Sequence, residues 1–168
     1  MVSSKTEILN RDQIKQKIER LTYQIYEDNV DEKEIILAGM QGNGYLLAQL
    51  IANALKKIST LHIHLVQIGM DKKNPLKGQT TLSPDNIQYK NKVVVVADDV
   101  LNSGKTLIYG MRVFLELPIK KMRTVVLVDR NHKSFPIAAD FTGVSMATTL
   151  QEHVTVVLEK GAECAYLE

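Results

Sequence analysis

The first strongly patterned segment of the chain is an amphipathic helix. Its apolar face is formed by residues that recur at spacings of four, three and four: Ile14, Ile18, Leu21 and Ile25. Asn10 stands where a helix N-cap belongs, and Gln13 stands three residues later, in the second position of a capping box. The pattern therefore predicts a helix that begins just after Asn10.

The central part of the chain alternates between short apolar runs and longer amphipathic segments. Residues 34–38 form an apolar run that leads into a glycine-rich loop at 39–44, and a second helix follows with apolar residues Leu46, Leu47, Leu50, Ile51, Ala54 and Leu55. Residues 61–68 alternate as a half-buried strand does. A long polar stretch, 71–91, contains two prolines and a glycine and is interpreted as a loop or hairpin.

The remainder of the chain continues this alternation of strand and helix. Residues 92–97 include four consecutive valines, which is typical of a strand buried on both faces. A helix is expected over residues 103–117, where Pro118 ends it. Three further strands are expected, the last two from weaker patterns: 122–128, 141–144 and 153–158.

Strands that alternate with helices predict an α/β fold. We expect a single domain over residues 1–168, with a central, mostly parallel sheet, helices on both faces, a flexible loop and short C-terminal strands. The chain shows no internal repeat and no interdomain linker. Its single cysteine, Cys164, excludes an internal disulfide, and no apolar run approaches the ~20 residues of a spanning helix. These features, with no secretory signal visible, favour a cytoplasmic protein.

The segment most informative about function is residues 93–106. A buried strand ends in two adjacent carboxylates, Asp98 and Asp99, and Ser103-Gly-Lys-Thr106 then opens a helix. Ligands of α/β sheets bind beyond the carboxyl ends of the strands, and helix N-termini favour phosphate. The carboxylates would repel phosphate at contact distance, but they can accept hydrogen bonds from sugar hydroxyls or face hydrated Mg²⁺. The whole pattern indicates a phosphorylated sugar.

Two better-known phosphate motifs are excluded by single residues. A Walker A loop needs glycine at position 99, which is Asp99, and a dinucleotide fingerprint at residues 42–47 needs glycine or alanine at position 47, which is Leu47. An alternative interpretation makes the acidic pair a turn with an N-cap. That alternative explains one aspartate and not the complete set. The histidines His62 and His64 share a strand face, but no third ligand has the spacing of a metal motif.

Residues 93–106 resemble the phosphoribosyl diphosphate signature of type I phosphoribosyltransferases. Within that family, nearly the whole chain is similar to the pyrimidine operon attenuation regulator (PyrR) and its uracil phosphoribosyltransferase relatives. Outside the signature, the likeness is carried by residues 36–39, 126–133 and 135–143. The resemblance implies a homodimer or a higher homo-oligomer.

The resemblance also implies roles for individual residues. Asp98 and Asp99 would be catalytic and would contact the ribose hydroxyls, while Asp129 and Arg130 would lie near the nucleobase. Mg²⁺ would be held through the diphosphate and waters, without direct protein ligands. The long loop within residues 68–83 would be a mobile cover. The residues implied to bind phosphoribosyl diphosphate are Asp98, Asp99, Asn102, Ser103, Gly104, Lys105, Thr106, Gln41, Gly42 and Asn43.

By this resemblance the chain would transfer a phosphoribosyl group to a nucleobase, with uracil favoured over a purine. The diphosphate loop, residues 39–44, lacks the basic residue that relatives usually carry, so slow turnover is expected. The alternative is a nucleotide-sensing, RNA-binding regulator with weak or no transferase activity. RNA binding is not favoured, because basic residues on an amphipathic helix are more often its solvated face. The candidate RNA-binding residues are Arg11, Lys15, Lys17, Arg20, His132 and Lys133.

Overall fold

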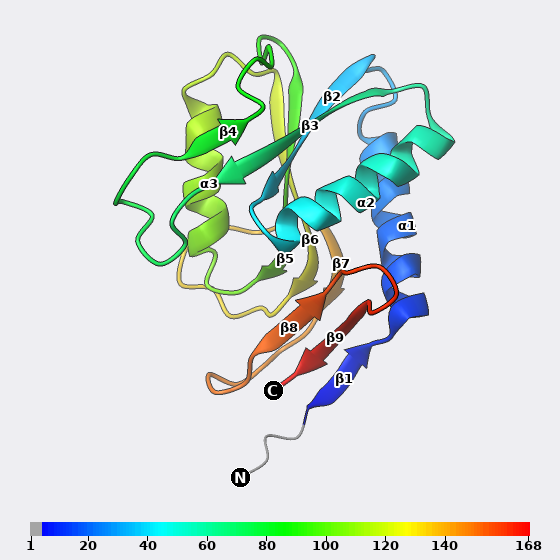
Figure 1. The fold of residues 1–168 in the computed structure, drawn as a ribbon, viewed down its shortest axis with the longest axis vertical. Helices are drawn as coiled ribbons and strands as arrows, with labels where there is room; N and C mark the ends of the chain where they lie inside the picture. The colour runs from blue at the N-terminus through cyan, green and yellow to red at the C-terminus, as the bar shows by residue number, and fades with distance from the viewer. Residues whose placement is uncertain (1–4) are drawn as a thin grey trace.

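The computed structural model describes residues 5–168, which form two sheets and three helices (Figure 1). A six-stranded sheet forms the centre of the molecule, and a three-stranded sheet contains both ends of the described chain. The elements are, in chain order, β1 (Thr6–Leu9), α1 (Arg11–Glu27), β2 (Glu34–Met40), α2 (Asn43–Ile58), β3 (His62–Gly69), β4 (Thr81–Ser83), β5 (Val93–Leu101), α3 (Lys105–Leu115), β6 (Lys121–Asp129), β7 (Phe141–Ser145), β8 (Val154–Val157) and β9 (Cys164–Leu167).

The central sheet has the strand order β4-β3-β2-β5-β6-β7. All of its neighbouring pairs are parallel except β3–β4, which confirms the predicted mostly parallel sheet. Because the strands are parallel, β2, β3, β5, β6 and β7 all end at the same edge of the sheet. Loops that follow those strands therefore converge there, as expected of a ligand-binding edge.

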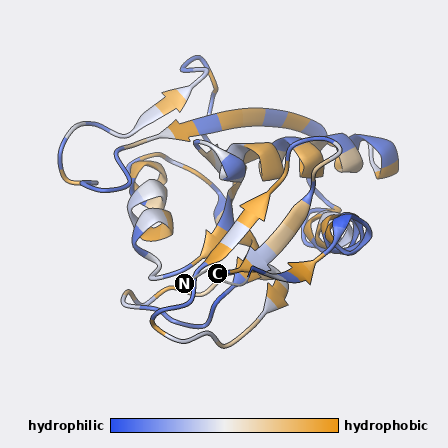
Figure 2. Cartoon of the chain, turned by 60° about the horizontal axis from the view of Figure 1, so that its bottom comes forward, coloured by the Kyte–Doolittle hydropathy of each residue, from blue (hydrophilic) through white to orange (hydrophobic). Residues whose placement is uncertain are grey.

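Helices cover both faces of the central sheet. The α1 and α2 helices pack on one face and α3 packs on the other, and each face has its own buried core. The valines of β5 divide between the cores, since Val93 and Val95 belong to one and Val94 and Val96 to the other. Figure 2 shows the central strands as mainly hydrophobic. The four-valine run is therefore buried on both faces, as its composition predicts.

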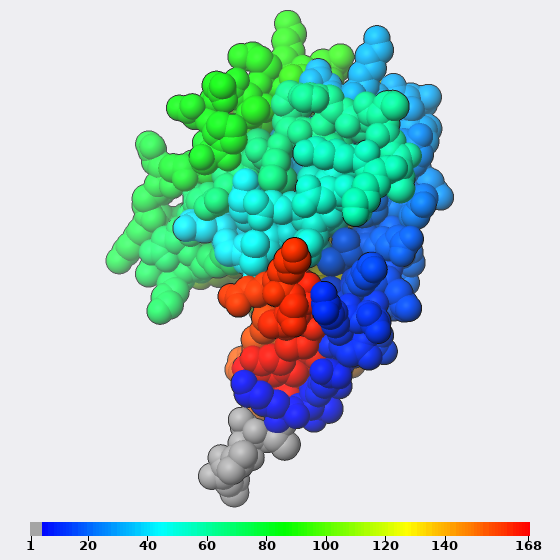
Figure 3. All heavy atoms as spheres, turned by 45° about the vertical axis from the view of Figure 1, so that its right-hand side comes forward, coloured from blue at the N-terminus to red at the C-terminus, as the bar shows by residue number. Residues whose placement is uncertain are grey.

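The small antiparallel sheet, of order β1-β9-β8, was only partly anticipated by the sequence. The β8 strand matches the expected strand at 153–158, whereas β1 and β9 were not predicted. Each is only four residues long, which is too short to carry a clear pattern. Their pairing joins residues near the two ends of the chain, such as Thr6 with Leu167. Figure 3 shows β1, β8 and β9 packed together below α2.

Several boundaries follow from local chemistry. The predicted capping box is present, because the side chains of Asn10 and Gln13 each accept from the other's backbone N–H. The β5 strand runs on through the acidic pair to Leu101, which is further than the valines alone predict. The α3 helix begins at Lys105, two residues later than expected. None of the helices formed by residues 5–168 is long and apolar enough to cross a membrane.

Candidate functional site

The acidic pair lies at the carboxyl edge of the sheet, next to the loop after β2. Gly39 of β2 pairs with Ala97 of β5, so the glycine-rich loop and the acidic pair leave the sheet at the same level. Gly44 of α2 also packs on β5, because a Cβ at Gly44 would lie 2.9 Å from both the Ala97 carbonyl oxygen and Asp98 Oδ1. The start of α2 therefore sits directly against the carboxylates.

Asp98 and Asp99 differ in exposure. Asp98 is 4% exposed and Asp99 is half-buried. Burial, reinforced by the neighbouring Asp99 carboxylate, raises the pKa of Asp98 to about 8. Its Oδ1 accepts a hydrogen bond from the Asp99 backbone N–H at 3.0 Å. Asp98 therefore keeps its proton to a higher pH than an ordinary carboxyl does.

The segment before α3 forms a small pocket of about 40 Å³. Gly104 precedes the helix with φ of 84° in the left-handed region, where a Cβ would lie 2.4 Å from Ile137 Cγ2. Gly104 is the N-cap of α3, so neither aspartate is, and the turn-and-cap alternative fails. The Lys105 backbone N–H donates to Ser103 Oγ at 3.3 Å, and the next N–H groups of the first turn are available to a phosphate. Five of the implied ligand-binding residues line the pocket: Asp98, Asn102, Ser103, Gly104 and Thr106.

The glycine-rich loop presents amides and no charge. Gly42 precedes α2 with φ of 93°, and no side chain caps this helix. Gln41 is exposed, and its backbone N–H donates to the Ile68 carbonyl oxygen at 2.9 Å. Asn43 is half-buried, and its Nδ2 donates to Asp99 Oδ2 at 3.2 Å and to the Val156 carbonyl oxygen at 2.8 Å. The loop can thus offer backbone donors to an anion, but its Asn43 amide already has two protein partners.

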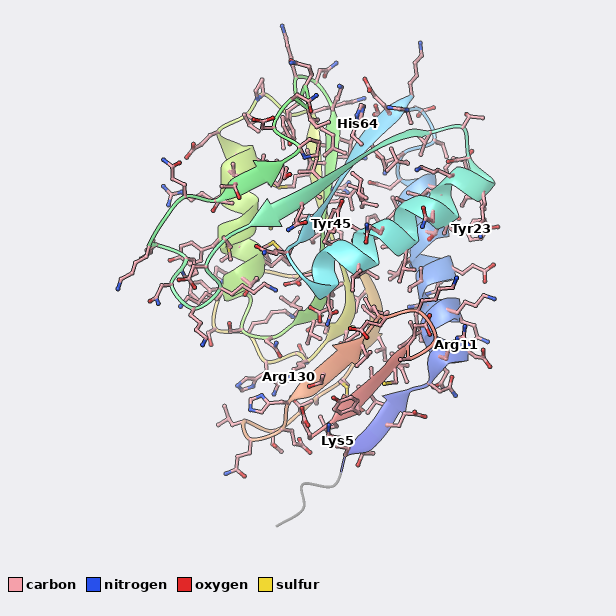
Figure 4. All side chains as sticks on the ribbon, viewed as in Figure 1. Lys5, Arg11, Tyr23, Tyr45, His64 and Arg130 are labelled. Carbon is pink, nitrogen blue, oxygen red and sulfur yellow. The ribbon has the colours of Figure 1, made fainter. Side chains whose placement is uncertain are left out.

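Arg130 follows β6 and joins the phosphate pocket to the segment before β8. The residue is buried, with 6% of its surface exposed. Its guanidinium donates hydrogen bonds to Asn102 Oδ1 and Thr148 Oγ1, each at 2.9 Å. It also donates to the backbone carbonyl oxygens of Thr149 and Glu152. Figure 4 shows Arg130 where the central sheet meets the small sheet. In this conformation its donors hold protein segments together and do not face an open base pocket.

The carboxylate of Asp129, the last residue of β6, also interacts with residues of the loop that follows this strand. Its Oδ1 accepts from the Asn131 backbone N–H at 2.7 Å, and its Oδ2 lies 3.1 Å from the Lys133 ammonium. The two oxygens therefore fix the turn after β6. A base that contacts Asp129 has to share this carboxylate with Lys133.

The loop between β3 and β4, residues 70–80, carries a basic side chain whose charge acts on the acidic pair. Asp71 Oδ1 accepts from the backbone N–H groups of Lys73 and Asn74, which forms an Asx turn. The charge of Lys72 opposes the rise in the pKa of Asp98, so Lys72 lies within electrostatic reach of that carboxyl. The loop leaves the sheet beside Gln41, since a Cβ at Gly69 would lie 3.5 Å from Gln41 Oε1.

Half of the basic residues considered for RNA contact have partners within the protein. Arg11 pairs with Glu163 at 3.3 Å, Lys133 pairs with Asp129, and Arg20 donates to two backbone carbonyl oxygens of β7. On α1, Arg11 and Arg20 therefore have partners within the protein. Among residues 5–168, no group of three or more His, Cys, Asp or Glu residues is placed to hold a metal ion, and His64 instead lies 2.6 Å from Glu34.

Comparison with known proteins agrees with this geometry. The model of the phosphoribosyl transferase domain matches residues 4–162, which is nearly the whole chain. The chain belongs to the phosphoribosyl transferase domain family. The bifunctional protein PyrR of Ligilactobacillus salivarius is 30% identical over 156 residues, which cover 88% of each chain. The bifunctional protein PyrR of Microcystis aeruginosa is 32% identical over 162 residues, covering 92% of this chain and 90% of the relative.

Solved structures of this family share the fold. The hypoxanthine phosphoribosyltransferase of Trypanosoma cruzi superposes with a TM-score of 0.76 at 13% identity, covering 96% of this chain and 95% of that one. A hypoxanthine phosphoribosyltransferase from Staphylococcus aureus gives a TM-score of 0.72 at 17% identity, covering 86% and 79%. The type I phosphoribosyltransferase fold expected from the sequence is therefore confirmed.

Reasoning from the sequence missed the contacts that side chains make across the site. The bond from Asn43 to Val156 spans 113 residues, and β8 showed only a weak strand pattern. The hydrogen bonds from Arg130 to residues 148–152 could not be predicted either, because no motif or spacing in the sequence indicates that these residues meet. The composition did indicate that Arg130 follows a buried strand, but not which way its guanidinium points.

Proposed function

We propose that this protein binds phosphoribosyl diphosphate and transfers its phosphoribosyl group to a nucleobase, with uracil favoured. The observation that carries the proposal is a single pocket that is lined by Asp98 and by the start of α3. The pocket brings the Asp98 carboxyl together with the residues that would bind the phosphate, and Asp99, which would contact the ribose, is the next residue of β5. Membership of the phosphoribosyl transferase domain family supports the same ligand.

The reaction is a displacement at the anomeric carbon of the ribose. The bond from that carbon to the diphosphate breaks, a nitrogen of the base forms the new bond, and the base loses a proton. Residues 102–106 would hold the 5′-phosphate, and the Asp99 carboxylate would accept hydrogen bonds from the ribose hydroxyls. The protein's contribution is to position the sugar and to stabilise charge that develops on it. The loop at 70–80 would limit access of water.

A magnesium ion fits this arrangement as a partner of the ligand. Mg²⁺ retains several waters and is commonly bound through one or two carboxylates together with substrate phosphates. Asp99, half-buried at the carboxyl edge, is the member of the acidic pair that can face such a hydrated ion. When bound, Mg²⁺ would neutralise part of the charge on the departing diphosphate.

Asp99→Ala tests the ribose role directly. The substitution removes a half-buried carboxylate, so we expect the fold to remain and the affinity for uridine 5′-monophosphate to fall about tenfold or more, the value of one or two charge-assisted hydrogen bonds. Calorimetric titration of wild type and variant with this nucleotide, and of wild type with phosphoribosyl diphosphate and Mg²⁺, measures it. Absence of binding by the wild type to both ligands would refute the proposed function.

A second candidate function is a nucleotide-sensing regulator with little transferase activity. It is favoured by one observation, which is that residues 39–44 contain no cation to stabilise a departing diphosphate. The curated relatives carry the name bifunctional protein PyrR, which is compatible with a role beyond transfer. A transferase assay with uracil, hypoxanthine and guanine separates the two: ligand binding without turnover on any base favours the regulator.

A further inference from the structure

The side-chain amide of Asn43 is fully committed as a hydrogen-bond donor. Its nitrogen carries two hydrogens, and it has two acceptors: Asp99 Oδ2 at 3.2 Å and the Val156 carbonyl oxygen at 2.8 Å. A carboxylate and a carbonyl can only accept, so the amide nitrogen, and not its oxygen, must face them. Asn43 consequently has no side-chain hydrogen left to donate to a diphosphate.

These two bonds join three distant parts of the molecule. Asn43 is the first residue of α2, Asp99 lies at the end of β5, and Val156 is a buried residue of β8. The partners are 56 and 113 residues away along the chain. The small sheet below α2 (Figure 3) is thus attached to a ligand-binding carboxylate through one amide.

We infer that Asn43 is a positioning residue, which orients the Asp99 carboxylate toward the ribose hydroxyls and couples its placement to β8. The inference rests on the proposed function of Asp99. One carboxylate oxygen, Oδ2, is held by the amide, which leaves Oδ1 to accept from the sugar. A carboxylate that is oriented before the ligand arrives loses less rotamer freedom on binding, and this preorganisation raises affinity.

The coupling works in both directions. If a fixed amide improves ligand binding by holding Asp99, then a bound ligand that holds Asp99 must stabilise the amide by the same amount. The same amide bonds the Val156 carbonyl, so occupancy of the ribose position is expected to stabilise β8. Asn53 serves as a matched control, because it is an asparagine of the same helix that is exposed to solvent.

The test compares two nucleotides on three proteins. Wild type, Asn43→Ala and Asn53→Ala are titrated calorimetrically with uridine 5′-monophosphate and with its 2′,3′-dideoxy analogue. We expect Asn43→Ala to bind the ribonucleotide about tenfold more weakly, the value of one hydrogen bond to a charged group, and to bind the dideoxy analogue as wild type does. Asn53→Ala is expected to match wild type with both.

Hydrogen exchange supplies a readout that a purely structural role would not move. In wild type, the ribonucleotide should slow amide exchange in β8, and in Asn43→Ala this ligand-dependent slowing should disappear. Asn43→Ser, whose hydroxyl can donate one hydrogen bond, replaces the alanine variant if that variant does not fold, and the same difference between the nucleotides is expected.

The outcomes separate this inference from the proposed function. If wild type binds neither nucleotide, the proposed function fails, and the positioning role falls with it. If wild type binds, but Asn43→Ala loses equal affinity for both nucleotides or loses none, the proposed function stands and the positioning role is wrong.

Discussion

At the scale of residues, the most consequential feature is that two adjacent aspartates have opposite surroundings. Asp98 is buried against the start of α2, whereas Asp99 is half-buried and bonded to an amide. Burial disfavours the charged form of a carboxyl, so the pair shares its ionisation unequally. Protonation of Asp98 therefore links the stability of the fold to pH.

Replacement of Asp98 by asparagine should remove this dependence on pH. Unfolded, the carboxyl ionises near 3.8, whereas in the folded protein it stays protonated up to about 8. Between these values the folded state binds one more proton, so the wild-type free energy of unfolding falls as pH rises, by up to about 1.4 kcal/mol per pH unit. Thermal melts of both proteins from about pH 5 to about pH 9, without Mg²⁺, measure the difference.

Asparagine keeps the acceptor oxygen that bonds the Asp99 backbone, so the difference in melting temperature should be smallest at the acidic end and should grow as the pH rises. At the alkaline end the variant should be the more stable one. Equal melting temperatures across the whole range would mean that Asp98 ionises in the folded protein at its ordinary pH.

At the scale of elements, the phosphate pocket depends on the abrupt start of α3. Gly104 supplies a left-handed residue before the helix, and its lack of a Cβ lets the loop that contains Ile137 pack closely. The same loop is attached by the backbone N–H groups of Ser134 and Phe135, which both donate to the Ser103 carbonyl oxygen. The pocket is therefore braced from outside by the segment after β6.

Gly104→Ala should disrupt this packing. A Cβ would lie 2.4 Å from Ile137 Cγ2, and the left-handed backbone adds about 1–2 kcal/mol of strain. We expect a drop in stability and a loss of nucleotide affinity of about tenfold or more, because the phosphate donors shift. Chemical denaturation and calorimetry measure the two effects.

Gly161→Ala is the matched control, since Gly161 has a similar φ of 90° in the turn before β9 and nothing lies within 4 Å of its Cβ position. Gly161→Ala should lose a comparable amount of stability through backbone strain, and it should bind the nucleotide as tightly as wild type does. If both variants lose affinity equally, packing against Ile137 does not shape the pocket.

The elements also show which parts of the fold can be predicted from the sequence alone. The parallel strands and all three helices were predicted, because four valines, a capping box and periodic leucines act locally. The strands β1 and β9 were not, since each has only four residues and they pair with each other across more than 150 residues of chain. For the same reason the grouping of Asp98 with residues 102–106 was predictable, whereas the bond from Asn43 to β8 was not.

At the scale of the whole molecule, the central sheet, the small sheet and the loop at 70–80 surround one ligand edge. The side chains of Asn43 and Arg130 link these parts, and the guanidinium of Arg130 is occupied by protein acceptors. A departing diphosphate would meet the start of α2, where Asp98 and Asp99 already face the positive end of the helix dipole. This arrangement is suited to binding more than to rapid turnover.

A cation placed in the diphosphate loop should therefore raise turnover. Gln41 is exposed and lies beside the loop at 70–80, so Gln41→Lys adds a charge without disturbing the amide of Asn43. Charge on the leaving group grows toward the transition state, and stabilisation that grows with it increases kcat more than it lowers KM. We expect wild-type kcat well below the typical ~10 s⁻¹ and a rise of about tenfold in the variant, measured with phosphoribosyl diphosphate, Mg²⁺ and uracil.

Gln24→Lys, which adds the same charge at an exposed position of α1, controls for a change in net charge and should leave kcat unchanged. Wild-type turnover that already reaches the typical value would contradict the expectation. It would mean that a cation reaches the diphosphate from elsewhere, and Lys72 is the residue to substitute next, because its charge already acts on Asp98. A kcat equal in wild type and Gln41→Lys, with both well below the typical value, would instead show that charge on the diphosphate does not limit the reaction.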